Sequence, residues 1–325
     1  MKKKTVVLNS MRDVTLSLWP ASEDSKKPCF LICPGGAYRN CDESEGAPIA
    51  KAYNKRGYTA FILRYSVGKD SGWPNPLEDF EAAMEYLTAH QEELPQIQPE
   101  PELENEPFPL SSAKNRPYAV ISCYGLAIRK TLAYCLPDAP DTSELVNETT
   151  CPVFLASSRN DWIVPIENTT KLIEAFERHF VDYEAHIYGY GLHGFRLGAE
   201  TGAAGPLFCA RVGNWMDDSL GWVEELTSGR YVSIRDCAEY QDAHAAVLST
   251  RNSCRKIFAN PRTGELLQKK FPIQYLLYQA AKKQVGFFMD TVSLRNLFQL
   301  AKVSEKAISK IDDALGAFEN VEECR

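Results

Sequence analysis

The sequence of 325 residues lacks any apolar run long enough to cross a membrane. A membrane-spanning helix needs roughly 20 consecutive apolar residues, and the core of a secretory signal needs at least about seven. The basic start of the chain, Met1 to Lys4, is followed only by Thr5 to Leu8 before the polar Asn9. We therefore expect no secretory leader, no membrane partner and a cytoplasmic location.

Positive charge is also in short supply. Lys and Arg number 36 against 43 Asp and Glu, which leaves a net charge of -7. Proteins that bind nucleic acids concentrate basic residues on one face, where they meet the phosphates. The acidic balance of this chain therefore argues against nucleic acid as a partner.

Closely spaced cysteines are missing as well. The ten cysteines include no Cys-x-x-Cys pair, and the chain has only five histidines. Structural zinc sites and redox motifs use closely spaced cysteines, and disulfide frameworks belong to small secreted proteins. The scattered spacing predicts buried free thiols, and we expect no metal and no other cofactor.

Buried strands and amphipathic helices do alternate in the first part of the chain. Val14–Trp19 alternates apolar and polar residues, which is typical of a half-buried antiparallel strand. Cys29–Cys33 and Tyr58–Tyr65 are apolar on both faces, as central parallel strands are. Helices are predicted at Glu45–Arg56 and Leu77–His90 from the spacing of their apolar residues.

The alternation breaks off at residues 91–117, which contain six prolines and six glutamates. Proline removes a backbone donor and glutamate repels its neighbours, so we expect an irregular acidic connection here. Order then resumes with three further strands, predicted at Tyr118–Cys123, Val153–Ser157 and Tyr183–Tyr188. Helices are predicted around Arg129–Leu136, Glu167–Phe180 and Pro206–Leu226.

The last part of the chain has a different character. A boundary is predicted at Thr227-Ser-Gly229, and residues 229–325 contain no run that suits a buried parallel strand. Short helices such as Pro272–Lys282 and Val303–Phe318 are expected there. The sequence thus predicts an α/β domain over residues 1–228, with helices on both faces of a mostly parallel sheet, and a small all-helical module over residues 229–325.

Three loops at the carboxyl ends of predicted strands carry residues capable of catalysis. In an open parallel sheet, loops at this edge form the ligand crevice. Pro34-Gly-Gly-Ala-Tyr38 has consecutive glycines, whose N–H groups suit an oxyanion hole. Asp161 and His193 each follow a strand of their own, in the order used by an acid that orients a general base.

Several segments resemble the acetyl-xylan-esterase-like group of α/β-hydrolases over residues 1 to about 226. They are Pro34-Gly-Gly-Ala-Tyr38, Glu45-Gly-Ala-Pro-Ile-Ala50, Leu63-Arg-Tyr-Ser66, Asn115-Arg-Pro117, Asp161-Trp-Ile-Val-Pro-Ile-Glu-Asn168 and Gly191-Leu-His-Gly-Phe195. The helical tail, from about Ile257 to Phe318, more weakly resembles a module appended to some bacterial carbohydrate-active enzymes.

The resemblance implies a metal-free serine carboxylesterase acting on a small-molecule or oligosaccharide ester, with acylated sugars as substrates. It would make Asp161 the catalytic acid and His193 the base. Backbone N–H groups of Gly36 and Ala37 would form the oxyanion hole. The substrate pocket would lie around three further side chains, Tyr38, Arg64 and Tyr65.

The nucleophile of this group is missing from the sequence. The group carries its serine as Gly-x-Ser-x-Gly on a turn between a strand and a helix, but glycine pairs at this spacing enclose Asp70, Arg196 and Glu200 here. The acidic connection stands where strand, elbow and helix are expected. Typical element lengths imply a loss of roughly 20–30 residues and a sheet shortened by the nucleophile strand.

Few residues could replace the serine. Ser111 and Ser112 lie in the acidic connection, where their polarity alone accounts for them. Cys123, or Ser122 beside it, ends a strand that might shift into the vacated position, with Gly125 close behind. Ile121, however, is large where a tight elbow needs a small residue, so a buried strand end is the favoured interpretation.

The sequence therefore indicates a carboxylic-ester hydrolase by descent, deacetylating carbohydrate, with its activity impaired. One alternative is a non-catalytic sugar- or ester-binding pseudoenzyme. The other is a gene product with an internal deletion that folds poorly, because loss of a central strand leaves neighbouring backbone groups unpaired. The oligomeric state does not follow from the sequence.

Overall fold

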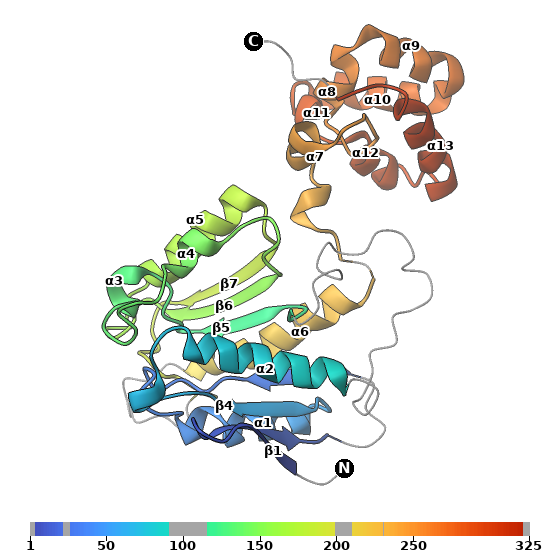
Figure 1. Ribbon diagram of the computed structural model, residues 1–325. Helices are drawn as coiled ribbons and strands as arrows, with labels where there is room; N and C mark the ends of the chain where they lie inside the picture. The colour runs from blue at the N-terminus through green and yellow to red at the C-terminus, as the bar shows by residue number, and fades with distance from the viewer. Residues whose placement is uncertain (1–3, 22–26, 91–115, 199–209, 230, 321–325) are drawn as a thin grey trace. The chain divides into compact units, whose positions relative to one another are not determined.

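The structure is a computed structural model that describes residues 4–21, 27–90, 116–198, 210–229 and 231–320 (Figure 1). It divides into two compact units, residues 1–231 and residues 232–325, which we call the N-terminal and C-terminal units. The boundary expected after residue 228 lies shortly before this division. Most of the acidic connection, residues 91–115, lies outside the described residues.

The strands of the N-terminal unit form two separate sheets. The first has the order β1-β2-β4-β3, in which β3 and β4 are parallel and the other pairs are antiparallel. The second has the order β5-β6-β7 and is parallel throughout. The bounds are Lys4–Asn9, Val14–Trp19, Phe30–Ile32 and Ala60–Arg64 for β1 to β4, and Val120–Cys123, Val153–Ser158 and Tyr183–Tyr188 for β5 to β7.

Helices cover both faces of these sheets, as predicted. The longer ones are α1 (Ala47–Lys55), α2 (Asn75–Ala89), α5 (Glu167–His179) and α6 (Trp215–Thr227). Short helical turns are η1 (Glu43–Glu45), η2 (Gly68–Asp70), α3 (Arg129–Leu132), α4 (Thr142–Leu145) and η5 (Ala210–Asn214). The predicted α/β class with a helical C-terminal region is thus confirmed.

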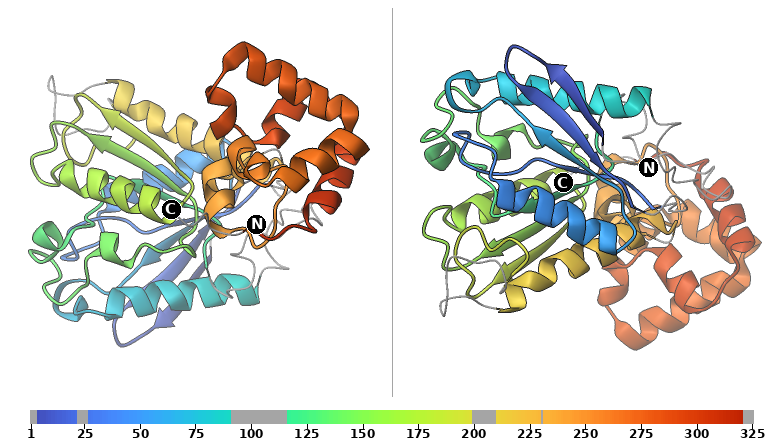
Figure 2. Two further views of the ribbon diagram at one scale, coloured as in Figure 1. Left: turned by 90° about the horizontal axis from the view of Figure 1, so that it is seen from above. Right: turned by 90° about the horizontal axis from the view of Figure 1, so that it is seen from below.

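One hydrophobic core spans both sheets. Helices α1 and α6 contribute Tyr53 and Trp222 to a cluster that also contains Ile62 of β4 and Phe154 of β6. The other helices serve one sheet each, because α2 packs on β2 and β4 and α5 packs on β6. The two sheets are therefore held together through the core to which α1 and α6 both contribute, and Figure 2 gives two further views of the ribbon.

The division of the sheet falls between β3 and β5. Each is the terminal strand of its own sheet, and among the described residues no strand lies between them. The alternative in which β5 shifts toward β3 is therefore wrong, because β5 pairs with β6 and not with β3. The loss of the nucleophile strand remains a prediction, and the described strands form two half-sheets.

Three elements differ locally from the prediction. The edge strand β1, Lys4–Asn9, was not predicted, because its apolar stretch is short and reads as an isolated segment until it pairs with β2. The helix expected at Arg129–Leu136 continues only to Leu132 as α3, followed by turns. The helix expected from Pro206 begins at Trp215, and residues 199–209 lie outside the described part.

The C-terminal unit is helical, with its own core. Buried Ile257, Leu294, Phe298 and Ile308 belong to one cluster. Its elements are η6 (Ile234–Asp236), α7 (Ala238–His244), α8 (Cys254–Ala259), α9 (Pro261–Lys270), α10 (Pro272–Val285), α11 (Phe288–Thr291), α12 (Leu294–Leu300) and α13 (Glu305–Leu315).

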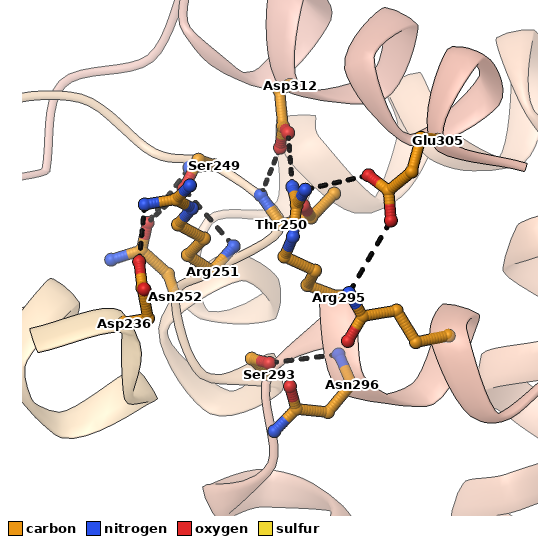
Figure 3. A network of polar contacts seen from close by, with 11 residues as sticks. Asp236, Ser249, Thr250, Arg251, Asn252, Ser293, Arg295, Asn296, Glu305 and Asp312 are labelled. Carbon is orange, nitrogen blue, oxygen red and sulfur yellow. Dashed lines mark hydrogen bonds and ion pairs between the residues drawn. The ribbon is translucent and has the colours of Figure 1, made fainter. Parts of the chain in front are cut away.

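Polar contacts fix the turns of this unit (Figure 3). Asp312 accepts from the backbone N–H of Thr250 at 2.6 Å and pairs with Arg295 at 3.3 Å. Arg295 also pairs with Glu305 at 2.7 Å, which ties α12 to α13. Ser293 caps α12 by accepting from the N–H of Asn296 at 3.1 Å. All of these groups satisfy one another, so the network reads as structural.

Candidate active site

Asp161 and His193 form a closely hydrogen-bonded pair. Nδ1 of His193 lies 2.8 Å from Oδ2 of Asp161, and the Asp161 side chain is almost completely buried. The other carboxylate oxygen accepts from the N–H groups of Ile163 and Val164, at 2.9 and 2.8 Å. The carboxylate is thereby fixed in orientation, so that it holds the proton on Nδ1 and leaves Nε2 as the basic nitrogen.

The loop that carries His193 is fixed by a neighbouring amide. Asn160 precedes Asp161 and accepts from the N–H groups of Gly191 and Leu192 at 2.9 and 3.1 Å. A Cβ at Gly191 would come within 3.2 Å of the hydroxyl of Ser158, so a larger side chain would crowd this approach. The two loops after β6 and β7 are therefore built to meet, which explains the Asp161–His193 contact.

Two adjacent N–H groups of the loop after β3, those of Gly36 and Ala37, have no acceptor among the described residues. Gly36 has φ +133°, and a Cβ there would lie 2.1 Å from the carbonyl oxygen of Asn40, so only glycine fits. Ala37 and Tyr38 follow with φ of 52° and 59°. Among the described residues nothing accepts from the N–H of Gly36 or Ala37. Such adjacent donors suit an anion or a developing oxyanion.

A cavity of about 1180 Å³ brings these elements together. Its lining includes the Gly35–Tyr38 loop, the Tyr124–Leu126 loop, Ile163–Pro165 and His193. Loops after β3, β5, β6 and β7 therefore share one edge of the divided sheet, as the crevice argument predicts. The lining is more apolar than polar, which is typical of ligand sites.

The three expected substrate residues are distributed unevenly. Tyr38 and Tyr65 line the cavity and pack edge to face, with ring centroids 5.8 Å apart. The hydroxyl of Tyr65 donates to the carbonyl of Pro34 at 2.7 Å, so this side chain supports the Gly35-Gly36 loop. Arg64 is outside the lining and pairs with Glu43 on the surface, so its substrate role is a prediction without support from the geometry.

Among the described residues, no hydroxyl or thiol is hydrogen-bonded to the histidine. Within the described ranges, the bond to Asp161 is the one hydrogen bond that His193 makes. Burial raises the pKa of the Cys123 thiol far above its ordinary value, and the nearby Glu45 raises it further. The thiol therefore stays protonated, which removes its nucleophilic form. The hydroxyl of Ser122 lies 2.6 Å from where a Cβ of Gly125 would stand, so it faces the following turn.

Tyr124 and Glu45 belong to the site although the sequence did not single them out. The ring of Tyr124 packs edge to face on His193, with centroids 5.1 Å apart, and its hydroxyl donates to Glu45 at 3.1 Å. Glu45 also accepts from the N–H of Gly35 at 2.9 Å. Burial, and after it Glu45, raises the pKa of the Tyr124 phenol well above its ordinary value, so it is no phenolate nucleophile.

Tyr124 could have been noticed in the sequence by its position between a strand end and Gly125. Its φ of 42° is unusual for a bulky residue and turns the chain sharply after β5. Glu45 has no comparable signal, because its role depends on contacts with two other loops. Together they connect the oxyanion loop to the histidine.

Other site types find little support. Within the described ranges, no three His, Cys, Asp or Glu side chains converge where a metal ion could bind. Every helix there is too short or too polar to reach across a lipid bilayer. The eight cysteines described are free thiols, but only Cys41 and Cys254 are buried, so the predicted burial is wrong for the others; Cys209 and Cys324 lie outside the described residues.

No family model matches the chain. A curated relative is endo-1,4-beta-xylanase B of Butyrivibrio fibrisolvens, 23% identical over 224 residues, which covers 54% of this chain and 34% of the relative. The match thus spans about a third of the length of that protein.

Solved structures match more completely. An α/β-hydrolase from a Medee basin deep-sea metagenome library, MGS-M1, is 28% identical with a TM-score of 0.60, covering 70% of this chain and 98% of its own. The carboxylesterase Cest-2923 of Lactobacillus plantarum is 19% identical with a TM-score of 0.59, covering 72% and 100%. An acetyl ester-xyloside bifunctional hydrolase of Caldicellulosiruptor lactoaceticus is 22% identical with a TM-score of 0.56, covering 70% and 97%.

These structures are similar in fold to this chain, and their coverage of it is about that of the N-terminal unit. The order of the oxyanion loop, Asp161 and His193 along the chain agrees with this fold. The N-terminal unit therefore has an α/β-hydrolase fold, and the chain continues into a helical C-terminal unit.

Proposed function

We propose that the N-terminal unit binds a small-molecule or oligosaccharide ester, as an acetylated-carbohydrate esterase does, but hydrolyses it very slowly. The observation that carries the proposal is the state of His193. Oδ2 of Asp161 lies 2.8 Å from its Nδ1, and the same cavity is lined by Gly36 and Ala37, whose N–H groups have no described acceptor. No described hydroxyl or thiol is hydrogen-bonded to His193. We thus regard the site as a retained binding site with an incomplete catalytic apparatus.

The described residues of the site would support direct attack by water. Nε2 of His193 would take a proton from water as its oxygen attacks the ester carbonyl. The N–H groups of Gly36 and Ala37 would stabilise the oxyanion. The imidazolium would then return the proton to the leaving alkoxide. Loss of the nucleophile in a serine protease costs about 10⁶ in kcat, which sets the expected scale of impairment.

The choice of ligand class follows the relatives. One solved neighbour is named an acetyl ester-xyloside hydrolase, and the curated relative is a xylanase. The alignment with that relative extends over 224 residues. It covers 54% of this chain, which is a smaller number of residues. This is in keeping with a segment that the relative has and this chain lacks.

The test is hydrolysis of an aryl acetate by the purified chain beside His193→Ala and Cys123→Ala, with binding of an acetylated xylo-oligosaccharide followed by calorimetry. We expect turnover at least about 10⁴-fold below that of a serine esterase, together with saturable binding. Tyr38→Ala should weaken binding, because its ring lines the cavity, whereas Arg64→Ala serves as the matched control outside it.

Two results would contradict the proposal. Rapid turnover that disappears in His193→Ala would mean that a nucleophile exists, and its loss in Cys123→Ala would identify it. A chain that shows no cooperative unfolding and no binding would instead support the poorly folding gene product. The cytoplasmic location is a separate proposal, tested by fractionation of cells that express the chain.

A further inference from the structure

The two half-sheets face each other across the cavity with backbone edges that have no strand partner among the described residues. The cavity lining contains every residue of β3 and every residue of β5. Each of these strands pairs on one side only, β3 with β4 and β5 with β6. The space between them, which we call the slot, is therefore bounded by two strand edges. An unpaired edge is a template for another strand.

The hydrogen bonds identify which backbone groups point into the slot. The N–H of Phe30 donates toward β4, to the carbonyl of Thr59, at 2.9 Å. The N–H groups of Val120 and Tyr124 donate toward β6, at 2.9 and 2.8 Å. Because successive residues of a parallel strand direct their backbone groups to opposite sides, the alternate residues face the slot. On β3 and its extension these are Leu31 and Cys33, and on β5 they are Ile121 and Cys123.

Both faces of the slot are apolar. Helix α1 provides Ile49 and Tyr53 on one side, and α2 provides Phe80, Met84 and Leu87 on the other. An occupant must therefore bury apolar groups above and below while it offers polar groups sideways. A purely apolar ligand leaves the edge N–H and C=O groups unpaired, at a cost of about 1–3 kcal/mol for each group that loses water.

We propose that the slot binds an extended apolar peptide as an added strand, parallel to β3 and β5. The complementarity is one of partial charges, since N–H and C=O groups alternate along both edges as they do along a strand. Apolar side chains at successive positions would then meet α1 and α2 in turn, as in any central parallel strand. The two edges would give the peptide hydrogen bonds on both sides. The proposal does not depend on ester binding.

The peptide comes from another chain. Residues 91–115, the stretch of this sequence between α2 and β5, contain five prolines and no two adjacent apolar residues apart from pairs that include proline. Proline lacks the N–H that a central strand must donate. This composition does not suit a strand that is buried on both faces.

Hydrogen–deuterium exchange with a synthetic peptide tests the proposal. The probe is a peptide of about six valine and isoleucine residues between terminal lysines, the length of an ordinary strand. We expect it to slow exchange at Leu31, Cys33, Ile121 and Cys123 at least about tenfold. Phe30, Val120 and Ser122, which face the neighbouring strands, should change little. The alternation distinguishes a strand from general stabilisation.

A matched control is the same peptide with N-methyl groups at alternate residues, which keeps the side chains but removes donors. Equal protection by both peptides would mean that only apolar contact matters, and this would overturn the proposal. No protection by either peptide would overturn it as well. Both peptides are tested on the unchanged protein, so a failure of a variant to fold cannot affect the result.

Other occupants give different patterns, each of which also refutes the proposal. In one pattern, the slot-facing amides are already protected in dilute protein and lose this protection when residues 91–115 are replaced by a glycine–serine linker. This pattern would indicate that a segment of this chain occupies the slot. Protection that grows with protein concentration alone, together with a larger species in sedimentation, would indicate a second copy.

Discussion

At the scale of single residues, the N-terminal unit depends on a few buried polar groups, such as Asp79, whose two carboxylate oxygens both accept hydrogen bonds. Asp79 in α2 is almost entirely buried, accepts from the N–H of Ser66 at 2.7 Å and pairs with Arg12 at 2.6 Å. Arg12 lies in the turn between β1 and β2 and also reaches the exposed Glu78. The pair therefore ties this turn to α2 and to the end of β4.

Asp79→Ala should destabilise the N-terminal unit by about 3–5 kcal/mol, because the partly buried Arg12 guanidinium loses its buried carboxylate partner. Glu78→Ala is the matched control, since it removes the exposed partner of the same arginine and should cost less than about 1 kcal/mol. Urea unfolding followed by tryptophan fluorescence measures both. Similar costs for the two variants would contradict the buried-pair argument.

At the scale of elements, aspartates at helix starts are fixed by local donors. Asp141 caps α4 by accepting from the N–H and hydroxyl of Ser143, at 3.0 and 2.6 Å, and from the N–H of Arg129 at 2.7 Å. Burial alone would raise the pKa of Asp141, but these hydrogen bonds outweigh it and lower that pKa below its ordinary value. The cap therefore links α3 and α4 in a charge-dependent way.

A lowered pKa makes this contribution dependent on pH. The stabilising effect is present above the pKa of the unfolded aspartate, roughly 3.9, and is lost as pH falls through the lower folded-state pKa. Asp141→Asn keeps a good cap without the charge. We expect the wild type to be the more stable at about pH 7, by less than about 1 kcal/mol given the exposure of the site, and the difference to vanish at about pH 2.

Urea unfolding at a series of pH values measures this difference, with Asp138→Asn as the control on the neighbouring loop. A difference that stays constant down to the lowest pH would show that the charge of Asp141 plays no part.

The sequence predicted most elements and the placing of Asp161 and His193, because these depend on local periodicity and on strand order. Buried strands such as Val153–Ser158 are recognisable from composition alone, and loops after parallel strands must share an edge. The split of the sheet and the Tyr124–Glu45 contact could not be predicted. Both depend on contacts between residues that are far apart in the sequence. The position of Arg64 was not predicted either, because it is set by an ion pair with Glu43.

At the scale of the whole molecule, the chain contains two units with separate hydrophobic cores. The C-terminal unit buries Ile308, Ile311 and Leu315 of α13 against α8, α9 and α12 without help from the first core. Each core is closed by its own helices. The units should therefore unfold as two cooperative transitions.

Ile308→Ala should lower the stability of the C-terminal unit by about 2–5 kcal/mol and leave the other transition in place, because a fully buried side chain is lost. Lys306→Ala, exposed on the same helix, is the control. Differential scanning calorimetry of the full chain should show one transition moving and one fixed. A common shift of both transitions would mean that the two units unfold together.

The divided sheet also makes this chain a natural acceptor for grafting. Helix α2 ends at Ala89 on one side of the slot and β5 begins at Val120 on the other. A strand, turn and helix spliced between them would follow the right-handed crossover that parallel strands require. The flanking edges, the Gly35-Gly36 loop and a histidine oriented by Asp161 are already in place. Chimeras at this junction would separate what a nucleophile segment contributes to catalysis from what the remaining scaffold supplies.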